Sequence, residues 1–301
     1  MLGRDLVDAL KPGGFELEGV GLGANSGLDI PYEALDLTRQ PLVGKFWDKS
    51  KPDLVFHSAA FTNVDECEKD KAFVSRANTQ AVEFVANASK KHNAPVVFFS
   101  TDFVFDGKDS REYFEEDKPN PLSYYGQTKA DAEEILRESG SLFVVFRLCW
   151  LYGLRGHSFP RSILGIAAKQ KELKVVGDHY GRPTYTRDVS KALAGLLKKE
   201  PGIFHRLSGQ IFHLANEGIT NWADFAEEIL KDAGFQNHTV TRIKFEEWKG
   251  AAECAERPRH AVLSLQKAWQ ILGIQLRPWQ EALKDFIGEY KKVLRERSLE
   301  E

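Results

Sequence analysis

The sequence predicts an α/β fold, with a doubly wound parallel sheet and a smaller α/β lobe after it. Residues 95–101 and 141–150 form apolar runs without polar alternation, as expected for strands that helices cover on both faces. Amphipathic segments lie between such runs, and residues 73–92 carry apolar side chains at helical spacing. Strands that alternate with helices in this way are typical of a parallel sheet.

The remaining elements follow from the same patterns in chain order. Short apolar runs predict further strands at residues 17–22, 53–60 and 211–214. Amphipathic spacing predicts further helices at residues 41–49, 121–138, 159–171, 187–199, 221–234, 263–272 and 279–295. The helix at 221–234 also has capping signals, with Thr220 or Asn221 before its first turn and Gly234 after its last.

The first residues are similar to the end of a phosphate-binding turn. Met1-Leu2-Gly3-Arg4 looks like the last glycine of a Gly-rich turn and the helix that follows it. The strand and the first two glycines that normally precede this glycine are missing from the sequence. We therefore expect an incomplete sequence start, with a natural truncated variant as the alternative.

The composition argues against several classes of protein. The formal net charge is −3 and the pI about 6.3, so there is no net positive field to bind nucleic acid or an anionic membrane. The three cysteines, Cys67, Cys149 and Cys254, lack the regular spacing of a disulfide framework or a cysteine zinc site. With neither a signal peptide nor an apolar run long enough to span a bilayer, we expect a cytoplasmic protein.

One pair of residues indicates acid–base chemistry. Tyr125 and Lys129 lie four residues apart in the predicted helix 121–138, which places them on one face. A nearby ammonium lowers the pKa of a tyrosine hydroxyl into a range that is useful for proton transfer. Thr101 ends the predicted strand 95–101, where its hydroxyl can polarise a substrate carbonyl. The alternative is a solvated helix face and a hydroxyl that caps a loop.

The motifs together resemble the dTDP-4-dehydrorhamnose reductase family, a branch of the extended short-chain dehydrogenases. STDFVFDG at residues 100–107 and NPLSYYGQTK at residues 120–129 carry most of this resemblance. Further similar motifs are AAFTNVD at 59–65, FRLCWLYG at 146–153, GRPT at 181–184 and RPR at 257–259. The sequence departs from the family pattern at Leu148-Cys149, where Thr-Ser is usual, and at Phe103, where Tyr is common.

The resemblance implies a Rossmann-type fold and reduction of the 4-keto group of dTDP-4-dehydro-6-deoxy-L-mannose to dTDP-L-rhamnose by NADPH or NADH. Tyr125 would protonate the new alkoxide, Lys129 would tune Tyr125 and anchor the cofactor ribose, and Thr101 would bond to the keto oxygen. Further cofactor contacts are expected at Gly3, Asp36, Leu37, Ala59, Ala60 and Thr62. Further substrate contacts are expected at Val64, Asp102, Trp150, Arg257 and Arg259. No metal site is expected.

The resemblance also implies two domains. Residues 1–149 would form an N-terminally incomplete dinucleotide-binding domain, and residues 150–301 would form a substrate-binding lobe from which one segment returns to the first domain. Two other functions stay open: a reductase for a different 4-keto-6-deoxy nucleotide sugar, and a dinucleotide-binding regulatory subunit similar to the β subunit of methionine adenosyltransferase. A homodimer stays open as well.

Overall fold

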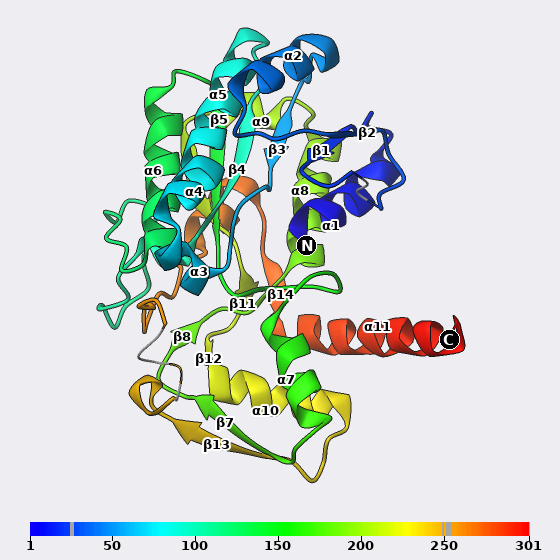
Figure 1. Cartoon of the computed structure of the whole chain (residues 1–301), viewed down its shortest axis with the longest axis vertical. Coiled ribbons are helices and arrows are strands. Elements are labelled where there is room, and N and C mark those ends of the chain that lie inside the picture. The colour runs from blue at the N-terminus through cyan, green and yellow to red at the C-terminus, as the bar shows by residue number, and fades with distance from the viewer. Residues whose placement is uncertain (25–26, 249, 251–253, 301) are drawn as a thin grey trace.

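A parallel sheet of four strands forms the core of the upper half of the molecule (Figure 1). The structure is a computed structural model that describes residues 1–24, 27–248, 250 and 254–300. The strand order is β10-β5-β4-β3, and all three pairings are parallel. The strands are β3 (Val55–His57), β4 (Val96–Thr101), β5 (Phe143–Leu148) and β10 (Gln210–His213).

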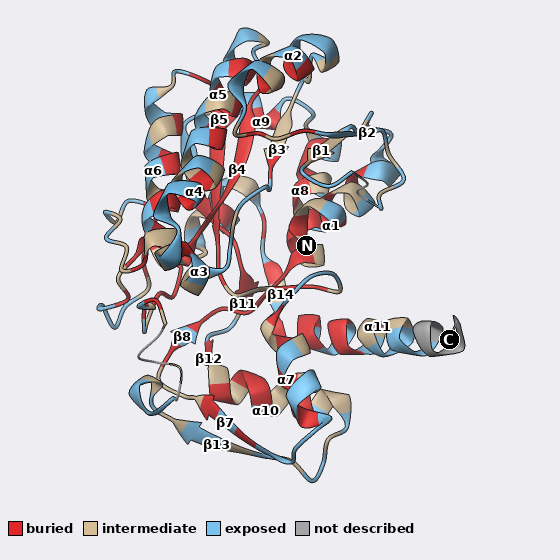
Figure 2. Cartoon of the chain, in the orientation of Figure 1, coloured by how far each residue is buried: buried red, intermediate tan, exposed pale blue. Residues whose placement is uncertain are grey.

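Helices cover both faces of this sheet, which confirms the predicted α/β class. Val97 and Phe99 of β4 pack on one face against α1, α8 and α9, whereas Val96 and Phe98 pack on the other face against α2, α5 and α6. All residues of β4 and β5 are buried, and they form the continuous red core in Figure 2. These helices are α1 (Leu2–Leu10), α2 (Gln40–Ser50), α5 (Ala81–Lys91), α6 (Tyr124–Glu138), α8 (Thr186–Lys199) and α9 (Ile203–Arg206).

The helical segment predicted at 73–92 is divided. It contains part of α4 (Lys71–Ser75), a π-helical stretch at Arg76–Gln80 and then α5. A separate short helix, α3 (Val64–Lys69), precedes it. The π-helical stretch turns the buried Asn78 toward the loop after β3, where it forms hydrogen bonds. π-Bulges are frequent at functional sites, and this one supports a predicted cofactor loop.

The lower part of the molecule has its own apolar core, which contains Tyr152, Phe225 and Phe286. The parallel strands β7 (Glu172–Val176) and β13 (Thr239–Ile243) pack there with α7 (Phe159–Ala167), α10 (Trp222–Ala233) and α11 (Trp279–Glu300). The predicted helix at 159–171 was too long, because the chain turns after Ala167 and begins β7 at Glu172. Neither β7 nor β13 was predicted, although Leu173 and Val175 alternate with polar neighbours.

Short strand pairs and turns complete the chain. Two of the pairs join β6 (Leu151–Tyr152) to β9 (Thr184–Tyr185) and β8 (Tyr180–Gly181) to β12 (Thr220–Asn221). The others join β11 (Asn216–Glu217) to β14 (Leu276–Pro278) and β1 (Gly19–Gly21) to β2 (Tyr32–Ala34). The 3-10 turns are Lys11–Gly13, Asp102–Val104 and Phe245–Glu247, and a second π-helical stretch is Ala268–Leu272.

A buried ion pair joins α6 to the main sheet. Arg147 of β5 donates from Nη2 to Glu133 Oε2 at 2.7 Å and from Nε to Glu133 Oε1 at 3.0 Å. The two side chains are 1% and 2% exposed. Because α6 carries Tyr125 and Lys129, this pair fixes the helix on which the predicted chemistry depends.

We expect Arg147→Ala to lower the free energy of unfolding by about 3–5 kcal/mol, because it leaves the Glu133 carboxylate buried without its partner. Urea unfolding followed by circular dichroism measures this loss. The control is Arg137→Ala on the same helix, whose ion pair with Glu134 is exposed and is expected to contribute at most about 1 kcal/mol. Equal losses in the two variants would contradict the assigned role of the buried pair.

Candidate active site

Thr101 and Asp102 lie where β4 ends. The Thr101 hydroxyl donates to Asp102 Oδ1 at 3.0 Å and accepts from the Phe103 N–H at 3.2 Å, so its orientation is fixed. Both side chains are buried. Burial raises the pKa of Asp102 to about 7, and the Thr101 hydrogen bond opposes this rise. The carboxyl edge of β4 therefore holds a fixed hydroxyl beside an acid that is partly protonated near neutral pH.

Tyr125 reaches the same edge from the first turn of α6. The helix begins after Ser123, whose Oγ accepts from the Gly126 N–H at 3.2 Å. A Cβ at Gly126 would lie 2.2 Å from the Phe103 carbonyl oxygen, so only glycine allows this contact between α6 and the turn after β4. Burial raises the pKa of Tyr125, against a smaller lowering by the Thr101 hydroxyl. Tyr125 is thus protonated at neutral pH and is able to donate a proton.

Lys129 lies one helical turn after Tyr125 and is 3% exposed. Its Nζ is 3.9 Å from the centroid of the Phe98 ring, a cation–π contact. Burial lowers the pKa of Lys129 to about 7, although Glu133 opposes the shift. Among the residues that the structure describes, Nζ forms no hydrogen bond, and its neighbours are the Phe98 ring and, through charge, Glu133. The amine therefore has capacity to bind a polar ligand group.

The loop after β3 is held in place by Asn78. Its Oδ1 accepts from the Phe61 N–H at 2.7 Å, and its Nδ2 donates to the Phe61 carbonyl at 3.0 Å. The same Nδ2 donates to Thr128 Oγ1 of α6 at 3.2 Å. Ala59, Ala60 and Thr62 of this loop are exposed. The sequence did not lead us to predict Asn78 as a support for the site, although an amide within an otherwise apolar helical face is a usable signal.

Trp150 lies at the end of β5 with a left-handed backbone, φ 46°. Its ring stacks on Trp222 of α10 with centroids 3.6 Å apart. A Cβ at Gly181 would lie 2.5 Å from the indole, so the ring can occupy this position only because Gly181 has no side chain. The indole is half-buried and packs against the lower core. Val64, in the first turn of α3, is also half-buried.

The two predicted arginines both form ion pairs. Arg257 Nη2 donates to both carboxylate oxygens of Asp65, at 2.8 and 2.9 Å. Burial alone would raise the pKa of Asp65, but the Arg257 contacts and the Ala255 N–H outweigh it and hold this pKa below its usual value. Arg259 is exposed and pairs with Glu246. Neither arginine forms a hydrogen bond with Thr101 or Tyr125 within the described part of the chain.

The other predicted cofactor residues lie on the side of the sheet that carries β1 and β3. Asp36 accepts from the Thr38 N–H at 2.9 Å and from the Thr38 hydroxyl at 2.7 Å, and these bonds lower its pKa. The Leu37 side chain packs in the core beside α2 and α5, which leaves its backbone for any ligand contact. Gly3 lies so close to Ser58 that a Cβ at Gly3 would be 2.5 Å from Ser58 Oγ.

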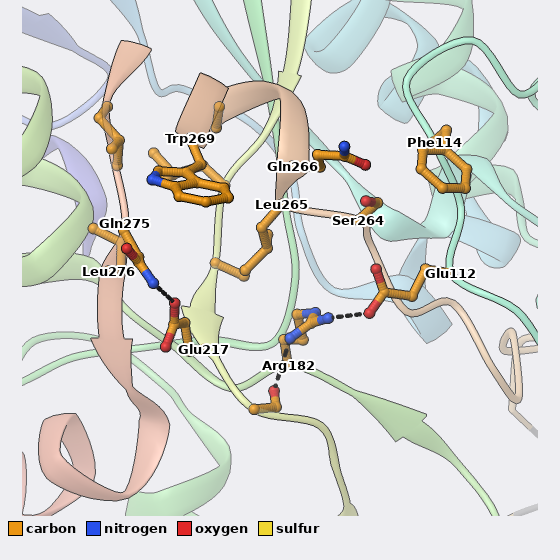
Figure 3. A pocket seen from close by; sticks show the side chains of 15 residues that line it. Glu112, Phe114, Arg182, Glu217, Ser264, Leu265, Gln266, Trp269, Gln275 and Leu276 are labelled. Carbon is orange, nitrogen blue, oxygen red and sulfur yellow. Dashed lines mark hydrogen bonds and ion pairs between the residues drawn. The ribbon is translucent and has the colours of Figure 1, made fainter. Parts of the chain in front are cut away.

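A separate pocket of about 420 Å³ contains none of the predicted site residues in its lining (Figure 3). In the wall of this pocket, Arg182 donates hydrogen bonds to Glu112 and to the Gly218 carbonyl. Trp269 forms the opposite wall of the pocket. Among the described residues, there is no group of three or more His, Cys, Asp or Glu side chains that could hold a metal ion. No helix in the described part of the chain is long and apolar enough to cross a membrane.

Comparison with known proteins identifies the family. The family model for the RmlD substrate-binding domain matches residues 1–292. The chain belongs to this family. It is 33% identical to the spore coat polysaccharide biosynthesis protein SpsK of Bacillus subtilis, over 96% of this chain and 94% of that protein. It is 32% identical to the dTDP-4-dehydrorhamnose reductase of Aggregatibacter actinomycetemcomitans, over 86% of this chain and 88% of that protein.

A solved structure from the same family is also similar. The dTDP-4-dehydrorhamnose reductase of Bacillus anthracis, in complex with NADP, superposes with a TM-score of 0.80 at 28% identity. The match covers 91% of this chain and 100% of that chain. Family membership thus agrees with the resemblance that the motifs around Thr101 and Tyr125 predicted.

The shifted pKa of Asp102 predicts the pH dependence of folding stability in this RmlD-family chain. The pKa is about 7 in the folded chain and 3.8 as the ordinary value, so the folded form keeps the proton between these limits. The stability from this proton is full below about pH 4 and is lost as the pH rises to about 7. We expect Asp102→Asn to remove this loss. The free energy of unfolding of this variant, measured with urea, should exceed that of the native chain by an amount that grows from about pH 5 to about pH 8.

The matched control is Asp106→Asn, four residues further on. Burial favours a raised pKa for Asp106, but hydrogen bonds from Tyr113, the Lys108 N–H and Asn120 lower it. Its contribution to stability is therefore present above about pH 4 and is lost as the pH falls. This pH dependence has the opposite sign to that of Asp102. A constant difference between Asp102→Asn and the native chain across this range would contradict a protonated Asp102.

Proposed function

We propose that the chain reduces the 4-keto group of dTDP-4-dehydro-6-deoxy-L-mannose to give dTDP-L-rhamnose, with NADPH as the hydride donor. The observation that carries this proposal is the placement of the Thr101 and Tyr125 hydroxyls at one strand edge, with Lys129 one turn further along α6. Membership of the RmlD family and the relatives named as dTDP-4-dehydrorhamnose reductases support the same reaction.

Three residues of the chain would take part directly in this reduction. The nicotinamide, when bound, supplies a hydride to the keto carbon. Thr101 would turn its one hydroxyl proton from Asp102 Oδ1 to the keto oxygen and stabilise the developing negative charge there. Tyr125, protonated at neutral pH, transfers its proton to that oxygen. Lys129 in its charged form lowers the pKa of Tyr125 and binds the ribose hydroxyls, which satisfies its amine.

The residues present fit a dinucleotide. Ala59 and Ala60 are exposed small side chains at the carboxyl edge of β3, where a cofactor can approach the backbone closely. Asp36 follows β2 and is half-buried, within reach of solvent. The buried Lys129 amine, which forms no hydrogen bond with any described residue, is the strongest indication, because a desolvated amine is stabilised by ligand hydroxyls. Gly3, Leu37 and Thr62 complete the proposed cofactor contacts.

For the sugar nucleotide, we assign Val64, Asp102 and Trp150 to the walls around the sugar. Arg259 is the proposed diphosphate ligand, because its ion pair with Glu246 is exposed and costs little to exchange. Arg257 is proposed to act beside it while Asp65 holds its guanidinium in place. A reductase for another 4-keto-6-deoxy nucleotide sugar is the second candidate, favoured by Phe103 and Cys149, which differ from the family pattern near the sugar walls.

Tyr125→Phe tests the proton donor. We expect NADPH oxidation with dTDP-4-dehydro-6-deoxy-L-mannose to fall by about 10²–10⁴-fold, since the phenyl ring has no proton to transfer. NADPH affinity, measured by nucleotide fluorescence, should hardly change. Tyr124→Phe on the same helix is the matched control, because its ring packs near Lys71 instead. Undiminished turnover in Tyr125→Phe would refute the assignment, and NADPH binding without turnover in the native chain would favour a regulatory subunit.

Arg259→Ala tests the diphosphate contact. We expect this variant to raise KM for the sugar nucleotide about tenfold or more and to change kcat much less, since the guanidinium would bind a part of the substrate that does not react. Steady-state kinetics with varied sugar nucleotide measure the split. Arg242→Ala is the control, because Arg242 is a similarly exposed arginine that pairs with Asp224 and Glu227. Equal KM values in the two variants would remove Arg259 from the site.

A further inference from the structure

Glu133 lies one helical turn beyond Lys129 on α6, so Tyr125, Lys129 and Glu133 follow one face of the helix at four-residue spacing. The Lys129 and Glu133 side chains are both buried. A buried carboxylate is therefore the next ionisable group along this face from the buried amine. Charges at such positions interact over several ångströms, because little water lies between them to screen the field.

Arg147 of β5 binds both oxygens of the Glu133 carboxylate. Its Nε lies 3.0 Å from Oε1 and its Nη2 lies 2.7 Å from Oε2. The guanidinium is held in turn, because Nη1 donates to the Glu115 carbonyl at 3.4 Å and Cζ lies 5.0 Å from the centroid of the Phe105 ring. Two N–H···O bonds from one guanidinium fix the orientation of a carboxylate. The Glu133 charge is thus held one turn from Lys129 without a bond to its amine.

The other ionisable groups around Lys129 come from neighbouring elements. Burial, with a smaller effect of the Lys129 charge, lowers the pKa of His57 in β3 to about 3, so this imidazole is neutral near pH 7. Burial raises the pKa of Cys67 in α3 to about 11, so this thiol is neutral as well. Asp102, after β4, titrates near pH 7, and its charge acts on the proposed proton donor. Glu133 is the carboxylate whose charge raises the pKa of Lys129 against the effect of burial.

We propose that Glu133 is a positioning residue that keeps Lys129 charged through space, while Arg147 prevents the carboxylate from bonding to the amine. The N–H groups of Lys129 then stay available to a ligand, although an anion lies nearby. A carboxylate that was free to turn would bond to the ammonium and compete with the hydroxyls of a ligand. The consequence for turnover rests on the proposed reduction, whereas the charge of Lys129 is measured without substrate.

The titration of Lys129 tests the proposal directly. In a chain isotopically labelled at the lysine Cε, the NMR signal that is lost in Lys129→Ala belongs to this side chain, and its shift with pH gives the pKa of the amine. We expect Glu133→Gln to lower this pKa by about one pH unit or more, since the negative charge is removed while an acceptor oxygen remains for Arg147. Glu134→Gln is the matched control, because Glu134 is exposed and pairs with Arg137. It should leave the pKa of Lys129 as in the native chain.

A double variant, Glu133→Leu with Arg147→Met, gives the same test if Glu133→Gln does not fold. Apolar residues of similar volume often replace a buried ion pair without loss of stability. This variant should also lower the pKa of Lys129. An unchanged pKa in whichever of these variants folds, or an equal decrease in Glu134→Gln, overturns the proposal.

Arg147→Lys tests the part that Arg147 plays. Lysine retains the positive charge beside Glu133 but lacks the planar fork, so one carboxylate oxygen is released and can bond to Lys129. We expect the pKa of Lys129 to rise in this variant, opposite to the change in Glu133→Gln, and NADPH binding to weaken by about tenfold. A decrease in the pKa, or unchanged NADPH binding, would contradict the role of Arg147.

The pH dependence of turnover separates this role from a purely structural one. The charged form of Lys129 is lost as the pH rises through its pKa, so NADPH turnover with the sugar nucleotide should fall at a lower pH in Glu133→Gln than in the native chain. A structural role alone would lower turnover by the same factor at every pH. A shifted Lys129 titration without turnover in the native chain would refute the reductase function and support this inference, whereas turnover with an unshifted titration would do the reverse.

Discussion

The site depends on the close contact between α6 and the turn that follows β4. At Gly126 the helix backbone lies so near to the Phe103 carbonyl that even a methyl group would collide with it. This approach brings Tyr125 to the strand end that carries Thr101. The buried Arg147–Glu133 pair holds α6 on the sheet further along the helix. One small residue and one desolvated ion pair thus determine where the proton donor lies relative to the strand edge.

Desolvation explains why ionisable groups here have pKa values near neutrality. Asp102 is raised to about 7 and Lys129 is lowered to about 7, in each case mainly by burial. The Phe98 ring beneath Lys129 provides an electron-rich face in place of an anion. A ligand that brings hydroxyl groups to Lys129 would favour its charged form, and a charged Lys129 would in turn favour ionisation of Tyr125. Ligand binding and proton transfer are therefore linked through the Lys129 charge.

The parts of the fold and site that depend on local sequence were predictable. β4 and β5 were predicted because both alternate sets of residues are apolar, and the four-residue spacing of Tyr125 and Lys129 was sufficient to place them together on α6. The features that depend on distant partners were not predictable. Arg257 pairs with Asp65 across 192 residues, and Asn78 bonds to Thr128 across 50. β7 and β13 form because they pair with each other, and β13 buries too few residues to show a strand pattern.

The two halves of the candidate site are positioned by strands that differ in burial. Thr101, Tyr125 and Trp150 are positioned by β4, β5 and α6, whose strand residues are fully buried. Asp36 and Ala59 follow β2 and β3, in the region where the strand edges face a cavity and are half-buried. Local opening is easier where backbone groups are unpaired and apolar contacts are few. The acid–base groups are therefore held more rigidly than the loops assigned to the cofactor.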